Sequence, residues 1–398
     1  MNNVIYPLAC TSWNQNELDA MQRVISTGSY SMGKEVRLFE EQFADYFGKK
    51  YAIMANSGSS ANLLMIAALF FKKQNPLKAG DEVIVPAISW STTYTPLQQY
   101  GLNVKFVDID LDTLNFDLVA LESAISDKTK AILAVNLLGN PNDFKRIKEI
   151  INNREIILLE DNCESMGAEF EGEKAGSFGL MGTFSTFFSH HISTMEGGLV
   201  ITDNEELYHI MLSLRAHGWT RNLPDNNFVS GEKSKNPFDE SFKFVLPGYN
   251  LRPLEFSGAI GQVQLVKLDS FVQERRNNAK IFNKLISKIH GIRIQKEIGK
   301  SSYFGFSIIL DENLGISRDM VVSKLISKGI ECRPIVTGNF TKNPTIKYFN
   351  YTIHNNLINA DNADKNGFFI GNHHYNLEKE IEYFARVLNE FIFVKNSN

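Results

Sequence analysis

The chain has 398 residues, 43% hydrophobic and 22% charged, which is ordinary for a globular protein and long enough for two domains. Its net charge of -4 argues against a nucleic-acid partner or a membrane-surface role. The N-terminal segment lacks the features of a signal peptide, and the longest apolar run, residues 61–71, is too short to cross a bilayer. We therefore expect a cytoplasmic protein without membrane contact.

Short apolar runs alternate with helical patterns through the first two thirds of the chain. Most of these runs are unbroken, as in strands that are covered on both faces. The predicted strands are residues 51–55, 82–86, 104–108, 131–136, 156–160, 183–187 and 198–202, and the predicted helices between them are 60–73, 92–100, 117–124 and 143–152. Repeated strand–helix–strand units predict an α/β fold with a mainly parallel central sheet.

The last part of the chain has a different pattern. Residues 221–240 are polar and rich in turn residues, and a loop of this length is usually functional or an intersubunit arm. A long helical stretch then runs from Pro253 to about residue 290, and an α+β pattern follows, with a strand at 304–310 and helices at 318–328 and 377–391. We place the domain boundary within the long helix. The expected units are a large cofactor-binding α/β domain, residues 1–265, and a small C-terminal α+β domain, residues 266–398.

The three cysteines, Cys10, Cys163 and Cys332, are far apart in the sequence. No Cys or His spacing suggests a zinc site. An iron–sulfur cluster normally needs four thiolates. We therefore expect neither a metal nor an iron–sulfur cluster.

Two segments that follow predicted strands suit a bound phosphorylated ring. The run NSGSSAN, residues 56–62, opens an apolar helix, and Gly58 and Ser59 would let backbone N–H groups approach an anion at the helix N-terminus. The same run also suits a plain turn with a serine cap. Trp90, in PAISWSTT, suits either stacking on a flat ring or packing in the core.

Two polar residues are further candidates. Asp161, in EDNCESMGA, ends an apolar run, where α/β folds bind ligands. It could bind a ring nitrogen of a bound cofactor, although a strand-end Asp also suits a helix cap. Asn250, in LPGYNLRP, lies in a Pro/Gly turn that needs no ligand to explain it.

The run GTFSTFFSHHISTMEGGLVIT, residues 182–202, resembles the cofactor-lysine segment of the sugar aminotransferases related to the DegT/DnrJ/EryC1 proteins. In that family the order is F-S, four residues, K, five residues and E-G-G. Phe184, Ser185 and the run 196–198 match, and the lysine position is His190. With the motifs above, the resemblance covers nearly the whole chain. It implies the fold type I of pyridoxal phosphate (PLP) enzymes, the aspartate-aminotransferase-like fold.

The resemblance also implies a role for each matching residue. The cofactor phosphate would be bound by Gly58, Ser59 and Ser185, with Asn250 reaching in from a second subunit of a homodimer. The ring would be held by Trp90 stacked on its face, Asp161 at its nitrogen and Glu164 near its 3-hydroxyl. The carboxylates of the amino donor, or the nucleotide-sugar, would be contacted by His217, Arg221 and Arg252, since arginine suits bidentate anion recognition.

His190 changes the chemistry that the family pattern predicts. An imidazole cannot form the Schiff base that lysine forms with PLP, but it can move protons near neutral pH. His191 is a second candidate base, yet only position 190 lies six residues before Glu196, as the family lysine does. The replacement narrows the resemblance to the PLP-dependent sugar 3-dehydratases, in which the cofactor is held without a covalent link.

The implied reaction is a C3 dehydration of a GDP-linked 4-keto-6-deoxy sugar. It gives a 3,6-dideoxy-4-keto sugar of the colitose type, for surface polysaccharide. The enzyme would use pyridoxamine phosphate (PMP), regenerated from PLP by L-glutamate, with no reductase partner. Three alternatives stay open: a C4 aminotransferase with non-covalent PMP, the same dehydration on a heptose, and a non-catalytic sensor that binds PLP or a nucleotide-sugar.

Overall fold

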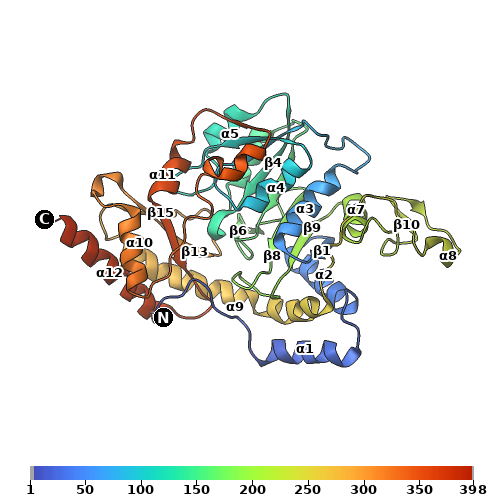
Figure 1. Cartoon of the computed structure of the whole chain (residues 1–398), viewed down its shortest axis with the longest axis horizontal. Helices are drawn as coiled ribbons and strands as arrows, with labels where there is room; N and C mark the ends of the chain where they lie inside the picture. The colour runs from blue at the N-terminus through green and yellow to red at the C-terminus, as the bar shows by residue number, and fades with distance from the viewer. Residues whose placement is uncertain (1–3, 397–398) are drawn as a thin grey trace.

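The computed structural model describes residues 4–396, and its centre is one eight-stranded sheet (Figure 1). The strand order is β1-β9-β8-β5-β4-β2-β3-β14. Only β9 runs against both of its neighbours, and the other pairs are parallel. The strands are β1 (Tyr51–Ala55), β2 (Glu82–Pro86), β3 (Asn103–Val107), β4 (Thr129–Val135), β5 (Ile157–Asp161), β8 (Met181–Ser185), β9 (Gly198–Thr202) and β14 (Tyr351–Ile353). The predicted mainly parallel α/β sheet is confirmed.

Helices cover both faces of this sheet, because its strands are apolar on both sides. Every residue of β2, β8 and β9 is buried. One apolar layer packs under α3 (Gly58–Leu69), α4 (Ser91–Gln99), α7 (Glu205–Arg215) and α11 (Ile358–Asn366). The opposite layer packs under α5 (Leu118–Ala124), α6 (Phe144–Ile151), α2 (Lys34–Phe47) and α9 (Glu255–Ile286).

The N-terminal helices α1 (Gln15–Thr27) and α2 pack along the first half of α9, as Figure 1 shows. The buried carboxylate of Glu255 accepts hydrogen bonds from the backbone N–H groups of Gly33 and Glu35, both at 2.6 Å. A carboxylate at a helix N-terminus satisfies free N–H groups and complements the helix dipole. The contact therefore fixes the start of α2 on the start of α9.

The C-terminal part forms a second, antiparallel sheet in the order β12-β13-β15. Its strands are β12 (Ile292–Ile294), β13 (Gly305–Leu310) and β15 (Gly367–Gly371), and its helices are α10 (Arg318–Ser327) and α12 (Glu378–Asn396). The 32 residues of α9 link this sheet to the large one. The predicted boundary at residues 265 and 266 falls inside α9 and stays a prediction. The segment between β13 and β15 returns to the large sheet, where it forms the edge strand β14 and the helix α11.

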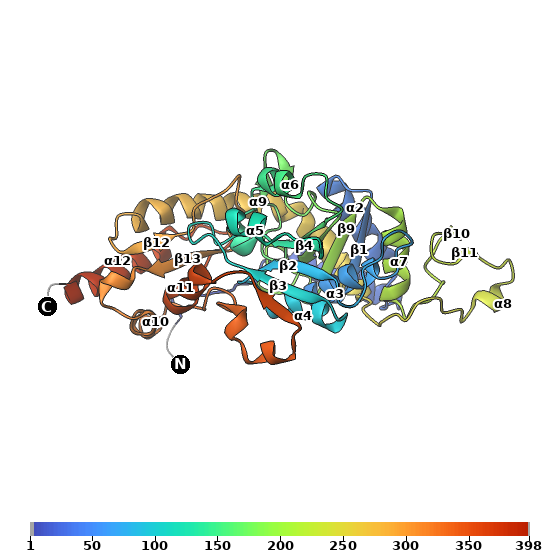
Figure 2. The ribbon, with the colours of Figure 1, turned by 90° about the horizontal axis from the view of Figure 1, so that it is seen from above.

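A polar segment leaves the body of the molecule after α7. Figures 1 and 2 both show it extending beyond α7, with the short helix α8 (Pro237–Glu240) near its tip. It also contains the hairpin of β10 (Asn226–Asn227) and β11 (Gly231–Glu232). We call residues 221–245 the arm. Its aromatic side chains Phe238 and Phe242 are 84% and 77% exposed, which is unusual for large apolar groups.

The remaining short elements complete the fold. They are the hairpin of β6 (Glu169–Phe170) and β7 (Glu173–Lys174), and the 3-10 turns η1 (Leu137–Gly139), η2 (Glu312–Leu314), η3 (Phe340–Lys342) and η4 (Pro344–Tyr348). Within the described part of the chain, no helix combines the length and the apolar character that a membrane span requires.

Candidate active site

Several of the predicted site residues lie at one edge of the large sheet. Strands β1, β2, β5 and β8 all end there, because they point in the same direction. Ser57 caps α3 just after β1, Trp90 lies at the start of α4 after β2, and Asp161 and Ser185 end β5 and β8. In open α/β sheets, ligands bind at the carboxyl ends of the strands.

Asp161 is buried, and its carboxylate accepts three hydrogen bonds. Its Oδ2 accepts from the Asn62 amide at 2.9 Å and from the Thr93 hydroxyl at 2.8 Å. Its Oδ1 accepts from the backbone N–H of Cys163 at 3.1 Å. Thr183 in turn donates to Asn62 Oδ1 at 2.6 Å, which fixes the amide orientation. Hydrogen bonds from three donors fix the orientation of the carboxylate.

Asn62 and Thr93 were not singled out from the sequence. Both lie inside the quoted runs, NSGSSAN and PAISWSTT, but nothing local shows that their side chains converge on Asp161. They come from α3 and α4, which lie on the same face of the sheet. A polar residue on the buried side of an apolar helix, such as Asn62, was the available signal.

The turn at the start of α3 leaves no room for larger side chains. A Cβ on Gly58 would lie 2.7 Å from the Cβ of Ser185 and 3.2 Å from the sulfur of Cys163. Ser59 donates to or accepts from Thr92 at 2.8 Å. The first turn of α3 also presents backbone N–H groups that have no partner within the helix. Gly58, Ser59 and Ser185 therefore form one small-residue cradle at a helix N-terminus.

Glu164 is attached to the turn that follows β4. Its Oε2 accepts a hydrogen bond from the backbone N–H of Leu138 at 3.0 Å. Burial, opposed by that hydrogen bond and reinforced by the charge of Asp161, raises the pKa of Glu164 to about 7. Leu138 itself has a left-handed backbone, with φ of 52°. The carboxyl group is therefore poised to be protonated or ionised near neutral pH.

His190 has no hydrogen-bond partner for its ring within the described residues, and its Nδ1 is fully buried. It packs between two aromatic rings, with centroids 5.9 Å from Phe187 and 5.1 Å from Phe304. Burial, and then the positive charge of Arg275, lower the pKa of His190 to about 3. The imidazole is therefore neutral at pH 7.

His191 is held differently from its neighbour. The side chain is buried, and its Nε2 lies 3.1 Å from the backbone carbonyl of Ser302, to which it donates. Burial and the charge of Arg275 also lower its pKa well below the ordinary value. This arrangement gives His191 a structural contact and leaves His190 as the uncommitted imidazole.

Trp90 is 58% exposed at the start of α4. This excludes the alternative that it packs in the core. A large, exposed aromatic surface at the ligand-binding edge of a sheet is available for stacking.

The four remaining candidates lie around the start of the arm. Arg252 donates to Asn250 Oδ1 at 3.0 Å, and Asn250 pairs with Ala216 in an isolated bridge. His217, beside that bridge, has a left-handed backbone with φ of 65°. Arg221 lies over the ring of Trp219 at 5.0 Å. Asn250, His217 and Arg221 are exposed.

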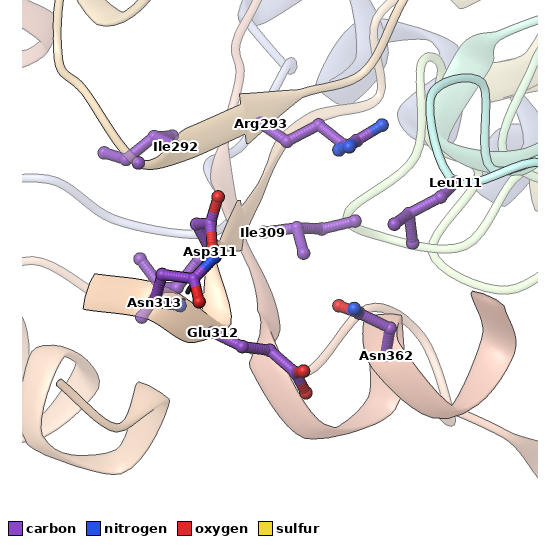
Figure 3. A pocket seen from close by; sticks show the side chains of 10 residues that line it. Leu111, Ile292, Arg293, Ile309, Asp311, Glu312, Asn313 and Asn362 are labelled. Carbon is purple, nitrogen blue, oxygen red and sulfur yellow. Dashed lines mark hydrogen bonds between the residues drawn. The ribbon is translucent and has the colours of Figure 1, made fainter. Parts of the chain in front are cut away.

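A cavity of about 490 Å³ lies elsewhere in the molecule, between η2 and β12 (Figure 3). It is lined by Arg293, Asp311, Glu312 and Asn362, among others. No predicted site residue lines it. Among the described residues, no group of His, Cys, Asp and Glu side chains is arranged to hold a metal ion.

The protein is a PLP-dependent α/β protein of the aminotransferase type, as its large sheet, its small antiparallel sheet and the residues at the carboxyl ends of the strands indicate. The chain belongs to the DegT/DnrJ/EryC1/StrS aminotransferase family, whose pattern matches residues 11–389. The family and the fold type I that the sequence predicted are thus confirmed.

Several relatives share almost the whole chain. A GDP-4-keto-6-deoxy-D-mannose 3-dehydratase from Yersinia pseudotuberculosis is 62% identical over 384 residues, which cover 96% of this chain and 98% of that protein. The solved structure of the E. coli enzyme of the same name, with bound hydrated PLP, is 60% identical with a TM-score of 0.96, covering 97% of this chain and all of that one. A further structure of such an enzyme, with a trapped PLP-glutamate geminal diamine, has a TM-score of 0.95 at 60% identity and covers 96% and 100%.

Proposed function

We propose that this protein catalyses the PLP- and glutamate-dependent removal of the C3 hydroxyl group from GDP-4-keto-6-deoxy-D-mannose. The observation that carries the proposal is a neutral, uncommitted imidazole, His190, at the position of the family lysine. The identity of 60–62% to enzymes of that activity, over nearly full length, supports the substrate. The product is a 3,6-dideoxy-4-keto sugar.

The residues at the sheet edge fit a phosphorylated pyridine ring. The cradle of Gly58, Ser59 and Ser185 is one that a single added Cβ would fill, and it opens onto a helix N-terminus, which favours a phosphate. Asp161 is held in place by three donors, which suits pairing with a ring nitrogen. Trp90 offers its exposed face to the ring.

When bound in its amine form, PLP supplies an electron sink next to the sugar's C4 carbon. The chain's own residues then handle the protons. Since Nδ1 of His190 is fully buried, Nε2 is the nitrogen that would reach the reacting atoms, and a neutral imidazole there would accept the proton lost from the cofactor carbon that bears the amine. The same nitrogen then returns its proton to the departing C3 hydroxyl group, which leaves as water.

Without a lysine at position 190, the cofactor is held without a covalent bond to the chain. Borohydride, which fixes a lysine–PLP link irreversibly, should therefore leave the mass of the intact protein unchanged. His190→Lys is the matched control, because it supplies an amine at the same place and should gain one pyridoxyl group. A pyridoxyl adduct on the unsubstituted protein would contradict non-covalent binding.

The proposal includes a homodimer with composite sites. Asn250, His217 and Arg221 are exposed beside the arm, and the arm itself exposes Phe238 and Phe242 to solvent. Large exposed apolar groups are typical of a surface that another chain covers. Sedimentation equilibrium should give twice the chain mass of 45.0 kDa at nanomolar concentration. A fully active monomer would exclude composite sites.

The decisive experiment separates the proposal from its alternatives by the fate of nitrogen and water. The protein is incubated with glutamate, PLP and GDP-4-keto-6-deoxy-D-mannose, and the nucleotide product is weighed by mass spectrometry. A nucleotide product that has lost the C3 oxygen, carries hydrogen in its place and has gained no nitrogen supports the dehydratase. A product that carries nitrogen at C4 and still has its C3 oxygen identifies a C4 aminotransferase. Turnover with a heptose but not with the hexose shows that the substrate is the heptose.

A further inference from the structure

Arg275 is a buried guanidinium group without a counter-ion. It lies on α9, is 4% exposed, and has no carboxylate within 4.0 Å among the residues whose side chains are described. Its Nη1 donates to the backbone carbonyls of Asn372 at 2.6 Å and Phe304 at 3.1 Å, while its Nε has no partner. Burying an uncompensated charge costs several kcal/mol, on the order of the whole stability of a domain.

The titratable groups around Arg275 do not supply the missing negative charge. Burial raises the pKa of the Cys10 thiol, which therefore stays protonated at pH 7. Burial also lowers the pKa values of His373 and His374 to about 4, so both imidazoles are neutral. The positive charge of Arg275 is therefore unopposed where it faces the rest of the site.

Two of the three carbonyl groups that Arg275 contacts, those of Tyr303 and Phe304, belong to the segment that covers His190. Tyr303 has a left-handed backbone, with φ of 45°, which a residue with a side chain adopts only when its surroundings enforce it. Asn372 donates to the Tyr303 carbonyl at 2.9 Å, and Arg275 reaches the same oxygen at 3.4 Å. The next residue, Phe304, donates to the carbonyl of Leu138 at 3.0 Å.

This segment connects both acid–base groups of the site. The ring of Phe304 packs against His190 with a centroid distance of 5.1 Å, and the N–H of Leu138 binds Glu164. Moving the Tyr303–Phe304 backbone would therefore shift the wall behind His190 and the turn that holds Glu164 together.

We propose that Arg275 is a positioning residue for His190, acting through the backbone carbonyls of Tyr303 and Phe304. The inference rests on the proposed role of His190 as the proton carrier. The charge of Arg275 and its hydrogen bonds act in the same direction, because both favour a His190 that is ready to accept a proton. After burial, the charge of Arg275 is the second cause that lowers the pKa of His190, and this favours the neutral form that accepts a proton. The other groups that act on the histidine pair are Arg276 and the two imidazoles themselves.

Arg276 provides a matched control on the same helix. It also donates to backbone carbonyls of the neighbouring segment, to Ser301 at 2.9 Å and Gly167 at 3.1 Å. Unlike Arg275, it lies within 3.8 Å of a carboxylate, Glu169. A loss that reflects only weaker anchoring of this segment should appear in Arg276→Gln as well as in Arg275→Gln.

The first measurement needs no turnover. The imidazole signal of His190 in the cofactor-free protein is followed by NMR from about pH 3 to 8, and is assigned by its absence from His190→Asn. In the unsubstituted protein and in Arg276→Gln the midpoint should stay at about 3. In Arg275→Gln the midpoint should rise by about one pH unit or more, because a like charge has been removed and the pocket loosened.

The second measurement is the rate of dehydration. Arg275→Gln should lower kcat by about tenfold with little change in KM, since the loss is in the placement of a proton carrier. Arg275→Lys keeps the charge and part of the donor set, so it should recover part of kcat and keep the low His190 midpoint. Arg275→Lys also takes the place of Arg275→Gln as the test variant if the glutamine variant does not fold.

Two outcomes would overturn the inference. One is an Arg275→Gln protein that is folded, has an unchanged His190 signal and loses no more kcat than Arg276→Gln. The other, if only the lysine variant folds, is a kcat for Arg275→Lys equal to that of the unsubstituted protein. Failure of the proposed function is distinguishable, because His190→Asn would then dehydrate normally while the NMR comparison still reports on Arg275.

Discussion

Asp161 and His190 lie at the same edge of the sheet but are held in opposite ways. Asp161 accepts hydrogen bonds from three donors, whereas no described residue binds the ring nitrogens of His190. The carboxylate is surrounded by amide, hydroxyl and N–H groups, and the imidazole by the rings of Phe187 and Phe304. A polar environment fixes a charge, and an apolar one keeps a base neutral.

The difference corresponds to two kinds of task. A group that stabilises charge works best when its partners are already in place before the reaction. A group that accepts a proton needs a free nitrogen and a pKa that leaves it neutral at working pH. Each of the following substitutions changes one side of this comparison, and they run from the largest expected effect to the smallest.

Replacing His190 removes the uncommitted base. His190→Phe keeps an aromatic side chain among Phe187 and Phe304, so it should fold and bind PMP. Dehydration should fall by at least about 100-fold, the usual contribution of a general base. Product formation and cofactor absorbance measure the two effects separately. A wild-type rate would place the proton carrier elsewhere, and His191 would be the first residue to examine.

Thr93→Val removes one donor from Asp161 while keeping the shape of the side chain. A hydrogen bond to a charged group contributes about 1.5–3 kcal/mol, so PLP should bind roughly ten-fold or more weakly. Spectroscopic titration with PLP measures the change. The matched control is Thr95→Val on the same helix, because Thr95 donates only to the Ser91 carbonyl of its own helix. Equal losses in both variants would show that Asp161 does not depend on Thr93.

Glu164→Gln tests the carboxyl group with the raised pKa. The folded protein binds a proton at Glu164 up to about pH 7, whereas the unfolded chain releases it near its ordinary pKa of 4.5. The stability associated with this group is therefore present below pH 4.5 and is lost as the pH rises toward 7. Urea unfolding of the cofactor-free protein should show a decline between pH 5 and 8 that is smaller in the variant, by about 1–2 kcal/mol.

The decline of stability between pH 5 and 8 should not vanish in Glu164→Gln. Burial raises the pKa of Glu160 to about 7 as well, and Glu160 accepts hydrogen bonds from the backbone N–H groups of Gly176 and Phe178. A pH dependence identical to that of the unsubstituted protein would mean that Glu164 is ionised throughout this range.

Trp90→Leu should have the smallest effect on stability. Because the side chain is 58% exposed, the free energy of unfolding should change by less than about 0.5 kcal/mol. Loss of stacking should weaken PLP binding by about 0.5–1.5 kcal/mol. Unfolding and PLP titration are measured on the same preparation. A large loss of stability with unchanged PLP affinity would assign Trp90 to packing instead.

The sequence by itself determined the class of the fold and indicated the residue that we propose as the base. Unbroken apolar runs predicted the strands of the large sheet from β1 to β9, because strands buried on both faces cannot alternate with polar residues. The resemblance to the family pattern, in which the lysine lies six residues before the position of Glu196, indicated His190 without any structure. Helices α1, α2 and α7 were not predicted, nor were the short edge strand β14 and the strand β15.

The ends of strands within uniformly apolar runs could be located only in the structure. The strand expected at residues 183–187 is β8, Met181–Ser185, two residues earlier. The run GTFSTFF is apolar and β-prone throughout, so its composition does not show where pairing stops. Pairing stops at Ser185, opposite Gly198, because the chain then turns into the loop that carries His190.

Only the tertiary structure decided how each site residue is held. Asn62 and Thr93 converge on Asp161 because α3 and α4 pack side by side on one face of the sheet. Phe304, the residue before β13, packs against His190, and Arg275 in α9 donates to the carbonyl of Phe304. Hydrogen bonding and desolvation act through space, so the pKa values they set depend on contacts between segments that no local pattern in the sequence records.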